Sequence, residues 1–144
     1  MSLVAGAYAG LAAGGVMVFL SHVAPRLGAG NYIREVFEPV VLGRILSRRE
    51  AQLVGVLFHL LLSLLFGIGF AFFVGQHWLS GFFVHSLFAW SVVMTLVIGL
   101  IIMPLEGHGW FGLKHDAWFM IDAFLTNLIW GFLFLGFVRL WTVV

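Results

Sequence analysis

The stretch AQLVGVLFHLLLSLLFGIGFAFFVG, residues 51–75, holds no charged side chain and a single histidine. An α-helix that spans the hydrocarbon core of a bilayer needs about 20 consecutive, predominantly apolar residues. This stretch is longer than that, and it is followed by the polar residues Gln76 and His77. It therefore predicts a transmembrane helix, and it places the chain among integral membrane proteins.

The rest of the chain repeats this pattern. Three more apolar runs, residues 3–24, 79–103 and 117–141, are long enough to span a bilayer. The chain of 144 residues is 62% hydrophobic and only 9% charged, whereas about a quarter of the residues in a soluble domain are charged. We predict an all-α integral membrane protein. Residues 1–144 would form one domain, a four-transmembrane-helix bundle with an amphipathic interfacial helix between the first two spans.

Lysine and arginine predict the orientation of the bundle, because they collect on the cytoplasmic side of a membrane. The first long connection carries five arginines, the second carries Lys114, and the other side has only Arg139. We therefore predict that both long connections lie in the cytoplasm and that the protein is N-out and C-out in a prokaryotic inner membrane. The net charge of +1 gives no attraction for nucleic acid.

The first connection contains the segment NYIREVFEPVVLGRILSRRE, residues 31–50, in which apolar residues recur at helical spacing. Charged residues fill much of the opposite face, which is typical of a helix that lies on a membrane surface. The lipid bilayer is then a partner, and three arginines could meet its headgroups: Arg44, Arg48 and Arg49. The segment could equally be an ordinary positively charged loop on the inner side, and the two interpretations are compatible.

Small residues recur every four positions in the first two spans. The first span carries Gly6, Gly10 and Gly14, and the second carries the set Gly55, His59, Ser63 and Gly67. Such spacing lets two helices approach closely in lipid. We predict that the first span packs against the second within the bundle. The alternative is dimerisation through the first span.

Seven ionisable residues gather at the cytoplasmic end of the predicted bundle: His22, His59, Glu106, His108, His115, Asp116 and Asp122. Since a charge inside a membrane is costly, such residues suggest a functional site. Asp122 in particular is predicted to turn toward the interior of the bundle. Three chemistries could use this cluster.

The first chemistry is a divalent metal site built from His59, His108 or His115 with Glu106 or Asp122. The second is haem or another tetrapyrrole, for which His22 and His59 are nearest in depth. The third is proton movement through Asp122 and His59, with His85 as a relay towards the outer side. The cofactor therefore stays unknown.

A structural explanation also accounts for these residues. His59 could donate one hydrogen bond to a neighbouring helix, and Asp116 could cap the last helix. The chain has no cysteine, which excludes disulfides and thiolate metal ligands, and it lacks the motifs of hydrolases and of phosphate-binding loops. We therefore favour a protein that is not an enzyme.

Four phrases resemble those of a broad group of small prokaryotic four-helix membrane proteins with no assigned activity. They are FHLLLSLLFGIGFA at 58–71, MPL at 103–105, HGWFG at 108–112 and NLIWGFLFLGFVR at 127–139. The resemblance implies the fold and assigns no function to any residue. We expect a non-enzymatic accessory or self-associating subunit, with other membrane subunits or a second copy as its partner. The alternatives are a metal- or tetrapyrrole-binding membrane protein and a small proton-coupled transporter.

Overall fold

The computed structural model describes residues 1–23, 26, 40–41, 44–45, 47–81, 83–114 and 118–143. Its long helices are α1 (Leu3–Val23), α2 (Arg48–Gly75), α3 (Val84–Val97) and α5 (Phe119–Val143). A π-helical segment, η3 (Ile98–Ile102), and the short helix α4 (Met103–Leu105) continue α3. This part of the chain contains four helical stretches that are long and apolar enough to cross a membrane. The predicted all-α membrane bundle is confirmed.

Local chemistry explains where two of these helices begin. α2 starts at Arg48, before the predicted position 51, because Ser47 caps it. The Ser47 hydroxyl accepts a hydrogen bond from the Glu50 N–H at 3.4 Å, and the Glu50 carboxylate accepts one from the Ser47 N–H at 2.9 Å. α3 starts at Val84 and not at 79, since His77 and Gly81 adopt left-handed conformations that end one helix and delay the next.

The helix predicted over residues 31–50 is wrong where the structure describes this segment. Val40–Val41 (β1) and Arg44–Ile45 (β2) form a short antiparallel pair, and residues 48–50 already belong to α2. The pairing of Val41 with Arg44 leaves two residues between the strands. The β-branched residues Val40, Val41 and Ile45 are of the kind enriched in strands, which favours this pairing over a helix. Residues 31–39 lie outside the described part.

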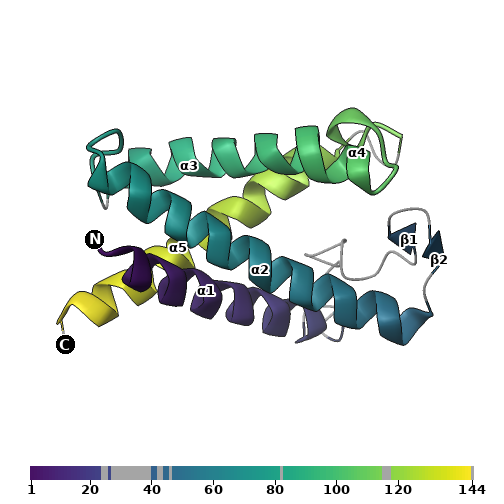
Figure 1. The fold of residues 1–144 in the computed structure, drawn as a ribbon, viewed down its shortest axis with the longest axis horizontal. Helices are drawn as coiled ribbons and strands as arrows, with labels where there is room; N and C mark the ends of the chain where they lie inside the picture. The colour runs from purple at the N-terminus through teal and green to yellow at the C-terminus, as the bar shows by residue number, and fades with distance from the viewer. Residues whose placement is uncertain are drawn as a thin grey trace.

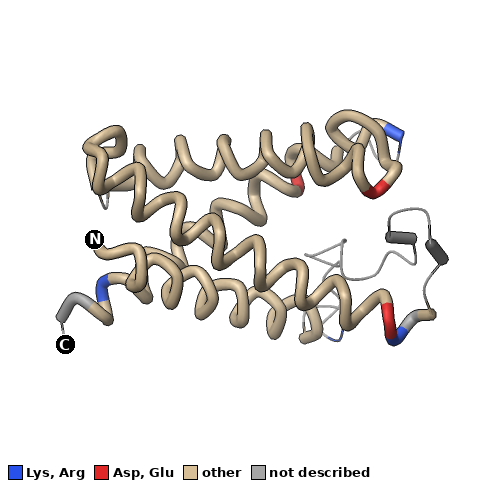
Figure 2. Tube along the Cα trace, viewed as in Figure 1, with Lys and Arg blue, Asp and Glu red and all other residues tan. Residues whose placement is uncertain are grey.

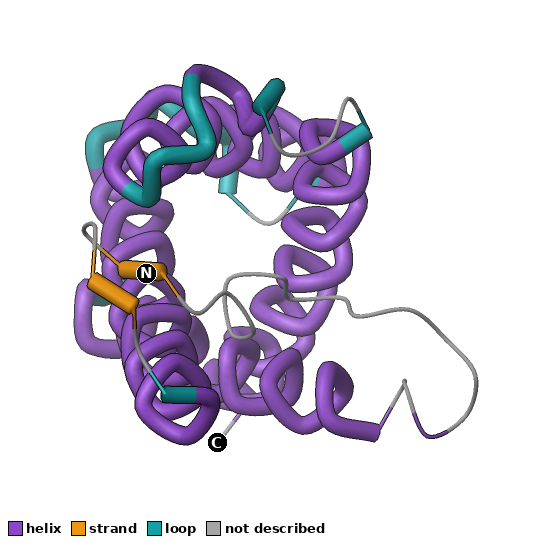
Figure 3. Tube along the Cα trace, turned by 90° about the vertical axis from the view of Figure 1, so that its right-hand side faces the viewer, coloured by secondary structure: helices purple, strands orange, loops and turns teal. Residues whose placement is uncertain are grey.

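Both termini and the α2–α3 turn lie at one end of the bundle, which we name the termini end (Figure 1). The loop after α4 and the β1–β2 pair lie at the opposite end, which we name the loop end. Most of the described lysines, arginines and acids lie towards these ends, and the acid of α5 lies further in (Figure 2). In the end-on view the helices stand around a common axis (Figure 3). An even number of spans thus brings the two termini together.

The helices pack in the order α2, α1, α5, α3. α1 packs along α2 and α5, and α3 packs along α5. α2 and α3 meet near the termini end, where Trp90 of α3 lies against Phe66, Phe70 and Phe73 of α2. From there the two ribbons diverge towards the loop end (Figure 1). The ribbons of α2 and α3 are therefore closest in the half that holds the termini.

The tightest contact joins α1 to α2 through their small residues. A methyl group added at Gly10 would overlap the carbonyl oxygen of Ser63, and one added at Gly14 would lie 2.6 Å from the Ser63 hydroxyl. One at Gly6 would lie 2.5 Å from the carbonyl oxygen of Gly67. The two backbones therefore touch, which only residues without large side chains permit. The structure thus places the predicted stripe inside the bundle.

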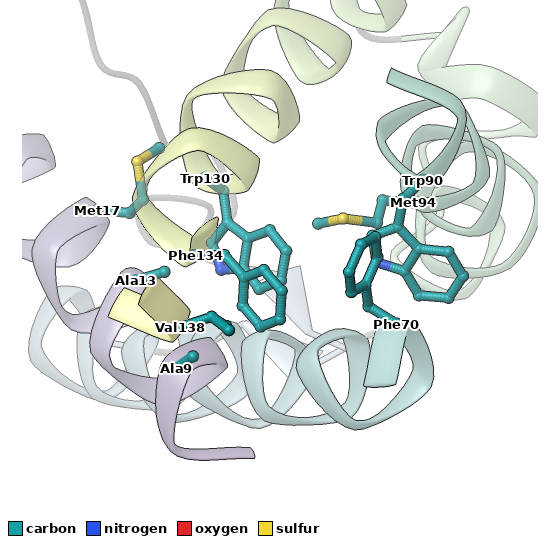
Figure 4. Close-up of a cluster of buried hydrophobic side chains, with 9 residues drawn as sticks. All are labelled: Ala9, Ala13, Met17, Phe70, Trp90, Met94, Trp130, Phe134 and Val138. Carbon is teal, nitrogen blue, oxygen red and sulfur yellow. The ribbon is translucent and has the colours of Figure 1, made fainter. Parts of the chain in front are cut away.

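Aromatic side chains fill the core of the termini end (Figure 4). Trp130 and Phe134 of α5 stack at 5.0 Å, and Phe134 meets Phe70 of α2 edge-on at 5.3 Å. Ala9 and Ala13 of α1 leave room for these rings. A second, smaller cluster lies near the loop end, where Phe58 and Leu62 of α2 pack against four buried residues: Ile98, Ile102, Met103 and Phe119.

The α1–α2 contact predicts opposite effects on stability for alanine substitutions at two glycines of α1, one inside the contact and one outside it. Gly10→Ala should lower the free energy of unfolding by roughly 1–3 kcal/mol, because the added methyl group forces the backbones apart. Gly15→Ala is the matched control, since nothing lies within 4 Å of its methyl position. It should gain up to about 1 kcal/mol from helix propensity. Unfolding in mixed SDS micelles measures both variants, and equal stabilities would contradict the packing.

Candidate functional site

The loop end collects several of the residues that the sequence singles out, and His22 is one of them. Its Nδ1 lies 2.8 Å from the carbonyl oxygen of Val18. A carbonyl oxygen only accepts, so Nδ1 donates and carries the proton. The other nitrogen, Nε2, lies 3.0 Å from the amide nitrogen of Gln52 and accepts from it. His22 therefore ties the end of α1 to the start of α2 with both ring nitrogens.

The loop that follows α4 folds back on the bundle. Gly107, Gly109, Phe111 and Gly112 all have positive φ angles, and among these Phe111 is the unusual one at 56°. A methyl group added at Gly99 would lie 2.7 Å from the Phe111 ring. The ring thus occupies the space beside Gly99 in η3. The HGWFG phrase is therefore a compact cap whose phenylalanine is held in a strained conformation.

The π-helical segment under this cap has a local cause. The N–H of Met103 donates to the carbonyl oxygen of Ile98, five residues back. The next residue, Pro104, has no N–H and cannot continue the helix in the regular way. A π-helical turn shifts the register just before this proline. The sequence predicted an ending here from Pro104, but it gave no signal for the π-helix.

Glu106 and His108 lie next to each other in the cap. The His108 Nε2 and a Glu106 carboxylate oxygen are 4.0 Å apart, and both side chains are mostly buried. Each of these residues makes a further contact. The loop thus brings together two members of the predicted cluster, whereas His115 and Asp116 fall outside the described residues.

His59 lies inside the bundle on α2. Its Nε2 is buried and has no hydrogen-bond partner in the described part of the chain. The prediction of a hydrogen bond from this ring to a neighbouring helix is thus not met at Nε2. The ring is on the same face of α2 as Ser63 and Phe70, four and eleven residues on, which are 3% and 0% exposed.

Asp122 does not turn into the bundle as predicted, since its side chain is exposed. The buried face of α5 runs through Phe119, Asn127 and Trp130, while Asp122 shares its face with the exposed Leu125. The helix also begins at Phe119, so Asp122 lies in its first turn. The positive end of the helix dipole favours an acid there. Its exposure and its place in the first turn account for an acid in this otherwise apolar helix.

His85 is the third member of the predicted proton relay, but its surroundings differ from those of His59 and Asp122. It is exposed near the start of α3, its Nε2 meets the Ser80 hydroxyl, and its ring stacks on Phe83 at 5.5 Å. The relay would need His59, Asp122 and His85 to be linked. The His59 side chain is half-buried and has no partner at Nε2 among the described residues, and the side chains of Asp122 and His85 are exposed.

No three described histidine, aspartate or glutamate side chains lie close enough to hold a metal ion. The backbones of Arg44 and Arg48 are described, as part of β2 and α2, and Arg49 is exposed in the first turn of α2. They lie at the loop end, where a headgroup contact would be possible. Gly55, the remaining member of the small-residue set, is buried in α2.

A polar network between α3 and α5 was missed by the sequence reasoning. The Asn127 amide nitrogen donates to the Thr95 hydroxyl at 2.9 Å, which donates to the carbonyl oxygen of Ser91 at 2.7 Å. The Ser91 hydroxyl in turn donates to the carbonyl oxygen of Asn127 at 3.3 Å. All three side chains are buried. Their four-residue spacing on α3 was a signal, but only the packing of α3 on α5 brings Asn127 to it.

Comparison with known proteins adds no assignment to this geometry: no protein family, curated protein or solved structure matches the chain. The resemblance to small prokaryotic four-helix membrane proteins therefore stays a prediction. The function has to be argued from the described residues themselves.

The geometry of the cap predicts that alanine substitutions at two of its glycines lower the free energy of unfolding by different amounts. Gly107→Ala should cost roughly 1–2 kcal/mol, because a side chain disfavours the left-handed conformation even though nothing lies within 4 Å of the new methyl group. Gly112→Ala should cost a further 1–3 kcal/mol or so, since its methyl group would lie 2.8 Å from the Phe119 ring. Unfolding in mixed SDS micelles measures the order. Equal losses would show that Gly112 does not pack on Phe119.

Proposed function

We propose that this protein is a non-enzymatic membrane subunit that associates with a second copy of itself, or with a larger membrane complex, in the inner membrane of a prokaryote. The surface that supports this proposal is the outward face of α2. Four leucines project from it at intervals of four residues and are 49–62% exposed: Leu53, Leu57, Leu61 and Leu65.

The geometry of α2 favours this face over the glycine stripe. The stripe of α1 is occupied by α2 itself, so dimerisation through Gly6, Gly10 and Gly14 would require the bundle to open. Side chains at intervals of four form a regular ridge, and such ridges fit the groove of another helix. Helices in lipid associate through this kind of packing. The leucine ridge is therefore the better candidate for contact with another molecule.

Single cysteines test this proposal cleanly, because the chain has none of its own. Leu61→Cys should yield mostly disulfide-linked dimers when membranes are oxidised, since two ridges would face each other. Leu125→Cys should stay mostly monomeric. The two leucines are 49% and 52% exposed, and each lies nine residues before a member of the Phe70–Phe134 contact. They are thus matched in exposure and nearly in depth.

Equal cross-linking of the two variants would reject the ridge as a self-contact. The accessory role has its own test, which is purification of the unmodified protein in a mild detergent. A partner subunit should then co-purify with the protein, and this co-purification should be lost when Leu57 and Leu61 are both replaced by alanine. Loss of the partner without loss of helix content would support the ridge, and retention would argue against it.

The orientation of the bundle is a further part of the proposal. The excess of basic residues in the connections at the loop end supports a cytoplasmic loop end, with both termini outside. In intact bacterial cells, Ser2→Cys should react with a membrane-impermeant maleimide, while Lys114→Cys should react only after permeabilisation. The reverse pattern would overturn the N-out, C-out orientation.

A cofactor-binding role is the second candidate, and one observation favours it. The buried Nε2 of His59 has no partner within the described residues. Metal content and the visible spectrum of the purified protein test the metal and tetrapyrrole forms of this role. A stoichiometric metal, or an absorption band lost in His59→Phe, would support it. A colourless protein without metal, purified without chelators, would reject those two forms.

A further inference from the structure

The cap carries large apolar side chains outside the two spans that it joins. One span ends at Leu105 and the next begins at Phe119, and the cap connects them at the loop end (Figure 1). Between these positions, Trp110, Leu113 and Trp118 are 64–68% exposed. Large apolar side chains that are exposed together often mark a surface that meets a protein or a membrane. The surroundings of the cap are therefore a question that the spans alone do not answer.

A strained turn separates Phe111 from its two neighbours in the cap. The Phe111 ring packs into the bundle, where it would lie 2.7 Å from a methyl group added at Gly99. Its φ angle of 56° is unfavourable for a bulky residue. The N–H of Leu113 donates to the carbonyl oxygen of Trp110 at 3.2 Å, which closes the turn around Phe111. The backbone thus accepts strain in a turn that buries one ring and exposes the apolar side chains on either side of it.

Lys114 adds a positive charge to the surface of the cap. Its side chain is exposed, whereas the side chains of Glu106 and His108 are only 16% and 18% exposed. A methyl group added at Gly109 would lie 3.1–3.4 Å from three carbons of the Lys114 side chain, so the apolar stem of the lysine lies against the cap. A lysine of this kind keeps its stem on apolar surface and its ammonium group in a polar layer.

The headgroup layer of a membrane fits this combination better than water or another protein does. Tryptophan is enriched where headgroups meet acyl chains, because its ring is apolar and its N–H can still donate a hydrogen bond. A lysine at the same level attracts anionic lipids, while lysine is depleted at the centres of protein interfaces. The level also agrees, since the spans on both sides end next to the cap.

We propose that the cap lies in the headgroup layer of the membrane and binds an anionic phospholipid there. The Trp110 ring and the Leu113 side chain would lie at the boundary of the acyl chains, and the ammonium group of Lys114 would lie beside the lipid phosphate. The strained turn at Phe111 would hold the two apolar side chains toward the lipid. The proposal does not depend on the proposed association of subunits, and it holds for either orientation of the bundle.

A single nitroxide label measures the position of the cap, because the chain has no cysteine of its own. Leu113→Cys carries the label on the cap, Leu125→Cys carries it on a span, and Gln76→Cys carries it on the polar turn at the termini end. The wild-type side chain is exposed at all three positions. Electron paramagnetic resonance in lipid nanodiscs then records collisions with oxygen, which concentrates in lipid, and with a water-soluble nickel chelate. The ratio of oxygen to nickel collisions at residue 113 should lie well above that at residue 76 and approach that at residue 125.

The same label at three positions removes the effect of the label's own affinity for lipid. A ratio at residue 113 equal to that at residue 76 would place the cap in water and overturn the proposal. Few collisions with either reagent would show that protein covers the cap, and would overturn it as well. Trp110→Cys provides a second labelled position on the cap if Leu113→Cys does not fold.

A second measurement tests the charge of the bound lipid. A fluorophore on Leu113→Cys is quenched by lipids that carry a nitroxide near the headgroup, either on phosphatidylglycerol or on phosphatidylcholine, in nanodiscs of the same overall composition. Quenching by the phosphatidylglycerol probe should be stronger by up to roughly fivefold, the effect of one positive charge at an anionic surface. Adding Lys114→Gln should remove this preference, Lys114→Arg should keep it, and high salt should weaken it.

The matched control for the charge is Arg139→Gln, which removes a positive charge from the far end of α5 and should leave the preference unchanged. Equal quenching by the two probes would overturn the assignment of an anionic lipid to the cap. A preference that survives Lys114→Gln would overturn the role of Lys114.

Discussion

The backbone contact between α1 and α2 is the constraint around which the bundle is built. Lipid does not drive apolar helices together, so the gain must come from short-range packing. Gly10, Ser63 and Gly67 allow the two helices to touch. The small-residue faces of both helices are occupied by this contact. The other helices then attach by different means. α5 meets α1 beside Ala9 and Ala13, and α3 is joined to α5 by buried hydrogen bonds.

The two halves of the bundle differ because these attachments differ. At the termini end, Trp90, Trp130 and Phe134 fill the space between all four long helices. Towards the loop end α2 and α3 separate, and the cap around Phe111 closes over η3 instead. Polar groups gather in this looser half. The half filled by aromatic rings therefore adjoins a half in which the Nε2 of His59 has no hydrogen-bond partner among the described residues.

α2 links the two proposed functions because it presents them on opposite faces. The leucine ridge, which includes Leu61, points out of the bundle, while His59 lies on the buried face with Ser63. Two positions that differ by two residues on a helix are about 200° apart. Contact with another subunit through the ridge would therefore not involve the side of α2 that holds His59. The two functions would not compete for the same surface.

The sequence by itself determined the fold class, the four spans and the small-residue stripe, because length, hydropathy and four-residue spacing are properties of one helix at a time. It was wrong about Asp122, since the buried face of α5 depends on how that helix packs against α1 and α3. It also expected a helix where β1 and β2 pair. Only the tertiary structure decided that Phe111 packs on Gly99, that Asn127 meets Thr95 and that the Nε2 of His59 has no partner among the described residues. These facts depend on which helix lies opposite, and the spacing of residues along one chain segment cannot specify its neighbour.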